Sequence, residues 1–189
     1  MPRPYCGFLG ALLLACTGFA SALGAQTADA PDSTTNPISA SLAQQYELVK
    51  GYVVKAAQEM PAADYGFRPT PKIRTFGQIV GHVADAEYGF CAGLRGAPSP
   101  QKNSAEKLAT KAELVKAVSA SFAYCEAPFR EARDAAMNDK VSMFDETHTR
   151  LYSMVSNVSH TNLHYGNMVI YLRLRGLVPP SSMPAPKGS

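Results

Sequence analysis

The sequence lacks a strong net charge of either sign. Its 189 residues include 18 Lys and Arg against 15 Asp and Glu, a formal net charge of +3 at pH 7, and the charged residues are spread along the chain. A nucleic-acid-binding protein is expected to gather basic residues into a patch or stripe. The composition therefore argues against a nucleic-acid partner.

The sequence also has little continuous apolar length: the core of its most apolar segment is too short for a good membrane-spanning helix, which needs about 20 residues. Its most apolar stretch, "GFLGALLLACTGFASALGA", follows a short start with one arginine and is followed by polar residues. These features are typical of a secretory signal peptide. We therefore expect residues 1–25 to be a signal peptide, cleaved between Ala22 and Ala25, and the mature protein to be periplasmic or secreted, without a stable membrane span. In the alternative, a lipoprotein signal, Cys16 would carry a membrane anchor, but the residues after it stay apolar where a tether is usually polar.

Cysteine is scarce, and the four that occur have neither the spacing of a redox Cys-x-x-Cys pair nor that of a metal cluster. Cys6 and Cys16 lie in the expected signal peptide. Cys91 and Cys125 remain, in two different predicted helices. In an exported protein they could form one disulfide, or they could be two small core residues. Both interpretations stay open, because a sequence does not give the distance between them.

Four segments show the apolar spacing of three or four residues that is typical of amphipathic helices, and the sequence has no series of strands and no internal repeat. We predict helices over residues 37–60, 75–94, 104–137 and 147–175. Asn36 is expected to cap the first helix, and Pro128 to kink or end the third. Residues 141–144 could form a short extended piece.

Loops rich in proline, glycine and polar residues separate these segments, so the sequence predicts an all-α fold, an antiparallel four-helix bundle. The bundle domain is expected to span residues 37–180. A polar linker over residues 26–36 precedes it, and a disordered tail over residues 181–189 follows it.

Three of the four histidines stand where a helical bundle could bring them to one point. His160 and His164 are four residues apart in "NVSHTNLHYGN", so their side chains share a helix face. His82 lies in a separate helical segment, "TFGQIVGHVADAEYGF". Three imidazoles from two helices can take three positions around a divalent metal and leave the others for water or substrate. This pattern predicts a reactive metal site, although each histidine could instead be a separate, hydrogen-bonded residue.

The last predicted helix carries more hydrogen-bonding groups on the face of its histidine pair. At about 100° per residue, a sector of about 80° holds Ser153, Asn157, His160, His164, Asn167 and Tyr171. A polar stripe on a largely apolar helix is costly unless its groups are satisfied by one another, by water or by a metal.

Two polar residues lie close to His82 on its own helix. Gln78 is four residues before it and Asp85 three residues after it, near enough to orient the imidazole ring. We predict Asp85 as the candidate catalytic residue, a general base for bound water, with a solvated surface acid as the alternative. Glu87 points about 140° away from His82 on a helix and is not a candidate. Thr161 occupies the place of the glutamate in a His-Glu-x-x-His motif, which excludes that zinc chemistry.

Two separated stretches resemble the DinB-like family. "MPAADYGFRPTPKIRTFGQIVGHVADAE" resembles the region that leads to the first metal ligand, and "VSHTNLHYGNMVIYLRLRGLVPP" resembles the later His-x-x-x-His, Tyr-Leu-Arg and Pro-Pro signature. The resemblance covers about residues 38–180. It implies a four-helix bundle with a divalent metal on His82, His160 and His164. One departure is "HYGN", where the family often has "HRGQ", so Tyr165 and Asn167 are expected to alter the rim of the site.

The resemblance also narrows the expected activity. The family includes thiol-cofactor-dependent transferases and isomerases, and many members described only as metal-dependent hydrolases. We expect an exported protein that binds a divalent ion, zinc or nickel, and uses it to activate water for hydrolysis of a small molecule. The alternatives are a non-enzymatic metal-binding stress or interaction protein and a thiol-dependent transferase, which is disfavoured where small thiols are scarce. The family analogy also suggests a homodimer.

Overall fold

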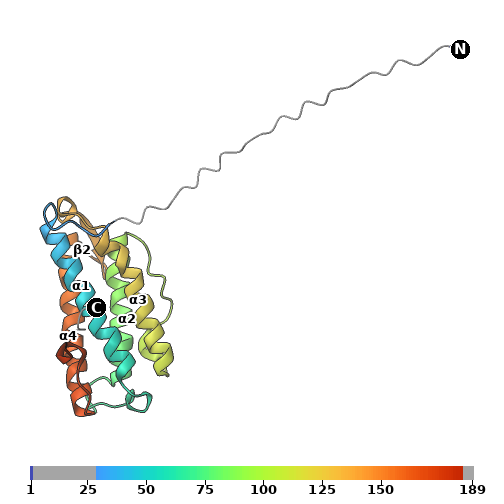
Figure 1. Cartoon of the computed structure of the whole chain (residues 1–189), viewed down its shortest axis with the longest axis vertical. Helices are drawn as coiled ribbons and strands as arrows, with labels where there is room; N and C mark the ends of the chain where they lie inside the picture. Colours follow the sequence, from blue (N-terminus) through green and yellow to red (C-terminus); the bar gives the residue numbers. More distant parts are fainter. Residues whose placement is uncertain (2–28, 185–189) are drawn as a thin grey trace.

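Four long helices run side by side in the computed structural model, which describes Met1 and residues 29–184 (Figure 1). The helices are α1 (Pro37–Glu59), α2 (Phe76–Arg95), α3 (Lys111–Arg130) and α4 (Arg150–Leu174). Short 3₁₀ turns lie in the connections, η1 (Ala62–Asp64), η2 (Ala105–Lys107) and η3 (Asp134–Ala136), and a fourth, η4 (Pro180–Ser182), follows α4. The expected signal peptide lies almost entirely outside the described residues. Within the described part of the chain, no helix combines the length and the apolar character that a membrane span requires.

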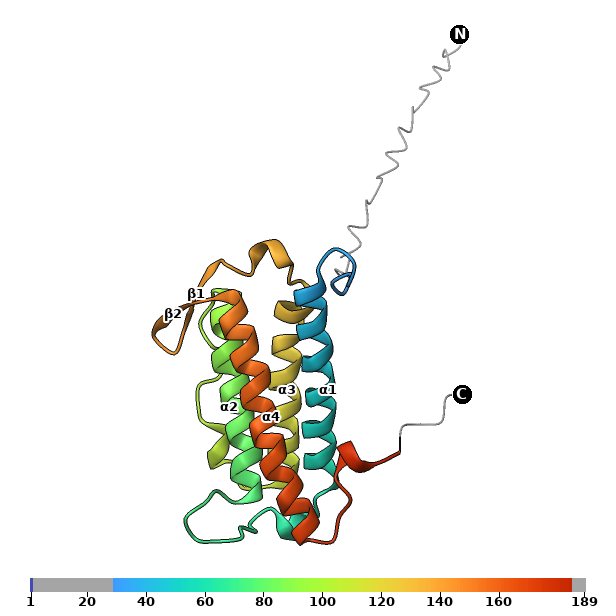
Figure 2. The same cartoon turned by 90° about the vertical axis from the view of Figure 1, so that its left-hand side faces the viewer.

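The helices form a closed bundle in which α1 and α2 each pack against both α3 and α4. In Figure 2, α2 and α4 run in opposite directions, as do α1 and α3, whereas α2 and α3 point the same way. The connection over residues 96–110 accounts for this, because it returns along α2 before α3 begins. The predicted four-helix bundle is confirmed, in the form that has a long crossover.

A glycine on α2 makes room for this crossover. Residues Ala105–Lys107 of η2 pack against α2, and a Cβ placed on Gly81 would lie 2.6 Å from the backbone of Ala105. Such a separation is far shorter than van der Waals contact, so any larger residue would displace η2. The position of the crossover therefore depends on the missing side chain.

Local signals set the ends of α2 and α3. Thr75 and Thr110 each form a capping box, with Gln78 and Glu113 as the reciprocal partners. The box at Thr110 starts α3 seven residues later than the predicted start at residue 104. At the other end α3 stops at Arg130, two residues after Pro128, and not at residue 137. The predicted third helix was therefore too long at both ends.

A β-hairpin, and not the start of a helix, precedes α4. Strand β1 (Lys140–Met143) pairs antiparallel with β2 (Glu146–Thr149), so α4 begins at Arg150 and not at residue 147. The two turn residues, Phe144 and Asp145, have φ values of 49° and 66°. A two-residue hairpin loop needs this backbone conformation, which is unusual for residues other than glycine.

The start of α1 is also held differently from the prediction. The side chain of Asn36 makes no capping bond to α1. Instead Asp134 reaches across from η3, and its carboxylate accepts hydrogen bonds from the backbone N–H of Ile38 at 3.1 Å and of Ser39 at 2.8 Å. Asn36 in turn accepts a bond from the Asp134 N–H at 3.0 Å. A residue almost a hundred positions away thus satisfies the helix terminus.

The core lies between the four helices. Fully buried side chains from each of them meet there, among them Tyr46, Val53, Phe76, Val83, Phe122, Phe129, Met154 and Leu172. Tyr46 stacks on Phe129 with ring centroids 4.1 Å apart and donates a hydrogen bond to the backbone oxygen of Phe122 at 2.8 Å.

A disulfide joins α2 to α3 inside this core. Cys91 and Cys125 are bonded, with Cα atoms 5.4 Å apart, and both are fully buried. Of the two interpretations that the sequence left open, the structure has the disulfide. Each cysteine lies in the C-terminal part of its helix, and the two helices run in the same direction. The bond therefore fixes the register of α2 against α3.

The described chain extends a little past the predicted end of the domain. The Tyr165 hydroxyl donates a hydrogen bond to Ser181 Oγ, in η4, at 2.8 Å and accepts one from the Ser181 backbone N–H at 2.8 Å. Residues 180–182 therefore pack against the bundle, although the tail was expected to begin at residue 181.

Candidate metal centre

Three histidine side chains meet between α2 and α4, which pack against each other and run in opposite directions (Figure 2). His82 comes from the second turn of α2, and His160 and His164 from consecutive turns of α4. The Nε2 atoms of His82 and His160 are 3.2 Å apart, and one ring nitrogen of each histidine lies within 4.8 Å of the other two. The structure thus brings together the three histidines that the sequence singled out, from positions almost 80 residues apart.

The nitrogen spacing suits a shared cation. Two imidazole nitrogens bound to one tetrahedral zinc ion, each at about 2.1 Å, are roughly 3.4 Å apart. The Nε2 atoms of His82 and His160 are at 3.2 Å, close to this value. The ring centroid of His164 is 4.6 Å from that of His82 and 4.5 Å from that of His160, so it closes a triangle.

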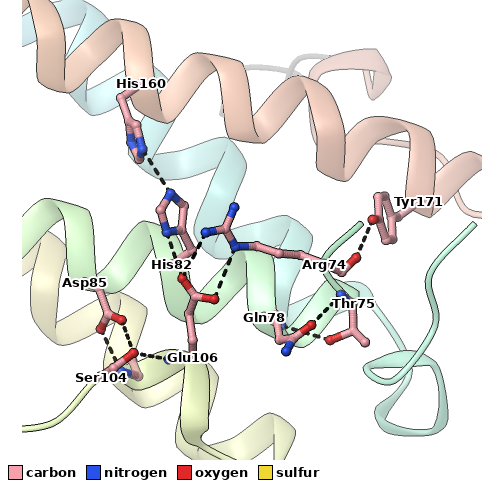
Figure 3. A network of polar contacts seen from close by, with 10 residues as sticks. Arg74, Thr75, Gln78, His82, Asp85, Ser104, Glu106, His160 and Tyr171 are labelled. Atoms are coloured by element: carbon pink, nitrogen blue, oxygen red, sulfur yellow. Dashed lines mark hydrogen bonds and ion pairs between the residues drawn. The ribbon is translucent and has the colours of Figure 1, made fainter. Parts of the chain in front are cut away.

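A glutamate holds the outer nitrogen of His82. Glu106, on η2, has one carboxylate oxygen 2.8 Å from His82 Nδ1, and Figure 3 shows the row from His160 through His82 to Glu106. Arg74 binds the same carboxylate from the other side, with its Nε at 3.2 Å from Oε2 and a terminal nitrogen at 3.3 Å from Oε1. With Nδ1–H donating to Glu106, the lone pair of His82 Nε2 faces His160. This is the usual support of a metal-binding histidine.

Sequence reasoning placed a different carboxylate beside His82. Asp85 does lie on the same side of α2, but the crossover covers it: the Asp85 carboxylate accepts hydrogen bonds from Gln101 Nε2 at 2.5 Å, Ser104 Oγ at 2.5 Å and the Ala105 N–H at 2.6 Å. Within the described residues, no hydrogen bond joins Asp85 to a histidine. Asp85 therefore does not orient the His82 ring; it holds the segment that carries Glu106.

Glu106 was missed because helical spacing does not reveal it. It lies 24 residues after His82, outside any long helix, and it reaches the ring only because the crossover returns along α2. Gln78, the other residue proposed to orient His82, caps α2 by accepting a hydrogen bond from the Thr75 N–H at 2.9 Å. The glycine at position 81 is a local signal that another backbone segment approaches α2 at this point.

The two histidines of α4 are held in their neutral form. Burial, and after it the neighbouring histidines and Arg74, lowers the pKa of both His160 and His164 to about 4. In the described structure the Nδ1 atoms of both rings are buried without a hydrogen-bond partner. An ion shared through the Nε2 atoms would not satisfy the Nδ1 of His160, so the fit to a metal rests on the neutral form of the rings, which metal ligation requires. The donor set therefore fits a divalent metal ion.

Asn157 of the polar stripe, together with Thr161 one turn later on α4, contacts another residue. Asn157 Nδ2 donates to one carboxylate oxygen of Glu87 at 3.0 Å, and Thr161 Oγ1 lies 2.6 Å from the other. Glu87 is 1% exposed, and burial raises the pKa of its carboxyl to about 7. Glu87 does point away from His82, as expected. It forms a separate buried polar group and is not part of the metal centre.

A cavity of about 490 Å³ opens beside the histidines. It lies between the loop before α2, the first turns of α2 and the last turns of α4, and His164 forms part of its wall. The Tyr171 hydroxyl donates to the backbone oxygen of Arg74 at 2.6 Å, which fixes this loop against α4 (Figure 3). The centre is thus closed by protein on the side of Glu106 and open to a small molecule at His164.

Comparisons with known proteins agree with the fold. The sequence profile of the DinB superfamily matches residues 45–168, which is more than half of the chain. The crystal structure of a DinB-like protein from Bacillus cereus ATCC 10987 has 17% identity and a TM-score of 0.63, and the match covers 74% of this chain and 93% of that one. A conserved protein from Enterococcus faecalis has 16% identity and a TM-score of 0.58, over 70% and 94% of the two chains. At these identities the likeness shows the fold alone. No curated protein matches the sequence.

Proposed function

This chain belongs to the DinB superfamily, and from that premise we propose that it is an exported metal-dependent hydrolase whose divalent ion is held by His82, His160 and His164. The observation that carries the proposal is the convergence of three ring nitrogens within 4.8 Å of one another. Imidazole ligands suit zinc and nickel, which we propose as the resident metals. Three protein ligands leave coordination positions free for water or substrate, as in catalytic sites.

The residues around the centre have distinct parts in this proposal. Bound there, a divalent ion acts as a Lewis acid and lowers the pKa of a coordinated water to about 7. Glu106 fixes the tautomer and the orientation of the His82 ring, and Arg74 holds Glu106 in place. The low pKa of His160 and His164 keeps their nitrogens available as ligands at neutral pH. The cavity beside His164 admits the substrate.

Asp85 has no part in the proposed chemistry. Its carboxylate already accepts three hydrogen bonds from the crossover. A general base must lie within hydrogen-bond reach of the proton that it removes. The carboxylate in contact with a histidine is that of Glu106, which holds His82 Nδ1 and is itself paired with Arg74, so its part is to orient the ring.

The disulfide supports the choice of hydrolysis outside the cytoplasm. Structural disulfides persist in oxidising compartments, and Cys91–Cys125 is buried between two helices. Small thiol cofactors are scarce in such compartments, which disfavours a thiol-dependent transferase. The cavity favours an enzyme over a non-enzymatic metal-binding protein, because a purely structural site needs no opening of this kind.

The test begins with the metal content of the mature protein, purified without chelator. We expect about one divalent ion per chain, lost in His160→Ala and kept in His148→Ala, a matched control on the hairpin. Hydrolysis of ester, amide and phosphoester panels should follow the metal content and return when metal is added back. A metal-free wild-type protein, or hydrolysis that is equal in the two variants, would overturn the proposal. N-terminal sequencing of the protein from a periplasmic or medium fraction tests the export.

A further inference from the structure

The cavity beside His164 is lined by two cations and by apolar side chains, with Asn167 and Tyr171 as further polar lining. Lys72 and Arg74 line it from the loop before α2. The apolar part of the lining is contributed by Pro69, Ile73, Ile79 and Ile170. The cationic and the apolar side chains line one cavity of about 490 Å³, so a ligand that fills it contacts both positive charge and apolar surface.

Neither cation is fully used by the protein itself. Among the residues that the structure describes, Lys72 forms no ion pair. Arg74 pairs with Glu106 through two of its nitrogens, while its side chain stays 44% exposed. A guanidinium group has five N–H donors, so Arg74 keeps donors for a ligand in the cavity.

The surroundings of the cavity have an excess of positive charge. Glu106 is the one carboxylate at the centre, and it is already paired with Arg74 and His82. A divalent ion on three neutral imidazoles adds to this excess. A neutral or cationic ligand would leave Lys72 without a counter-charge, whereas an anion offsets it.

We propose that the cavity binds a small organic anion with an apolar body, whose acidic group lies between Lys72 and Arg74 and whose apolar part packs against Ile79 and Ile170. This inference rests on the proposed function in one respect: the anion would be the substrate of the hydrolase, placed with its reacting bond toward His164. The recognition itself depends on residues of this chain, and it can be measured without catalysis.

The probe is 4-phenylbutyrate, compared with its neutral amide, by calorimetry or ligand-observed NMR on the mature protein. The acid should bind at least tenfold more tightly than the amide, and the difference should shrink as salt is raised, because the pairing is partly exposed. Lys72→Gln should reduce the preference for the acid roughly threefold to tenfold. The matched control is Lys116→Gln, which removes an exposed charge on α3, away from the cavity, and should leave the preference unchanged.

The same titrations on chelator-treated protein separate this inference from the proposed function. Lys72 acts without the ion, so the Lys72→Gln effect should persist when the metal is removed. If the protein proves to bind no metal but still prefers the acid through Lys72, the anion site stands and the hydrolase proposal falls. Equal affinities for acid and amide, or equal effects of Lys72→Gln and Lys116→Gln, would overturn the anion site whatever the metal content.

Discussion

Replacing Glu87 by glutamine should make the protein more stable at alkaline pH and change how stability depends on pH. Glu87 is buried between α2 and α4, and its pKa is raised by burial from 4.5 to about 7. Below the pKa of the unfolded chain, Glu87 is protonated in both the folded and the unfolded state, so burying it carries no charge penalty. As pH rises from about 5 to about 7 the unfolded chain ionises first, and stability falls.

The size of the effect follows from this shift. The change from 4.5 to about 7 corresponds to about 3 kcal/mol of folding free energy, as an order of magnitude. The penalty is absent below about pH 4.5 and complete above about pH 7. Glutamine is neutral throughout, so Glu87→Gln should gain that amount over wild type between pH 5 and pH 8.

The hydrogen bonds around Glu87 agree with an uncharged side chain. Thr161 Oγ1 lies 2.6 Å from a Glu87 carboxyl oxygen and 2.9 Å from the backbone oxygen of Asn157. A threonine hydroxyl has one hydrogen and can donate to only one of these oxygens. If Glu87 carries a proton, it donates to Thr161, and Thr161 then donates to Asn157. Glutamine can reproduce this arrangement with its N–H₂ group.

The assay is urea unfolding at pH 5 and pH 8, with the disulfide intact and a chelator present, so that pH-dependent metal binding does not contribute. The control is Glu131→Gln, which removes the same charge at an exposed site and should show no such pH dependence. If the free energies of unfolding of wild type and Glu87→Gln differ by the same amount at both pH values, the pKa of Glu87 is not raised and the reasoning fails.

Two further predictions concern the centre and the crossover. Glu106→Gln should weaken zinc affinity roughly tenfold to 100-fold in a chelator-competition titration, since the outer-shell carboxylate at His82 Nδ1 is lost; unchanged affinity would show that Glu106 does not support the ring. Gly81→Ala should destabilise the fold by about 1–3 kcal/mol in urea unfolding, because the new Cβ would lie 2.6 Å from the Ala105 backbone, whereas Gly51→Ala, with open space around its Cβ, should not.

The features that depend on local spacing could be predicted from the sequence. The pairing of His160 with His164 follows from the helical repeat alone, and the start of α2 follows from the capping box at Thr75. The convergence of His82 on that pair was one of two interpretations that the residues allowed, and the resemblance to the DinB-like family favoured it. The histidine pair and the start of α2 are encoded within a few residues of where they appear.

The parts that were missed depend on contacts between distant segments. The helix-length error at residues 104–137 arose because apolar periodicity continues through η2 and η3, where tertiary packing, not propensity, decides the conformation. The parallel direction of α2 and α3 and the contact of Glu106 with His82 both follow from the path of one connection. Asp134 caps α1 in a similar way, across 95 residues of sequence.

The path of residues 96–110 also limits how the chain can change in length. A connection between two helices usually needs only a few residues, so this one is longer than a simple turn requires. Its first part, before Gln101, is exposed and precedes the hydrogen bond from Gln101 to Asp85. Extra residues there would lengthen an exposed loop without moving the residues that follow. Between Gln101 and Glu106 the length of the chain is fixed, because a deletion would pull the Glu106 carboxylate away from the His82 ring. In related sequences, insertions and deletions should therefore fall before the position of Gln101 and not between Gln101 and Glu106.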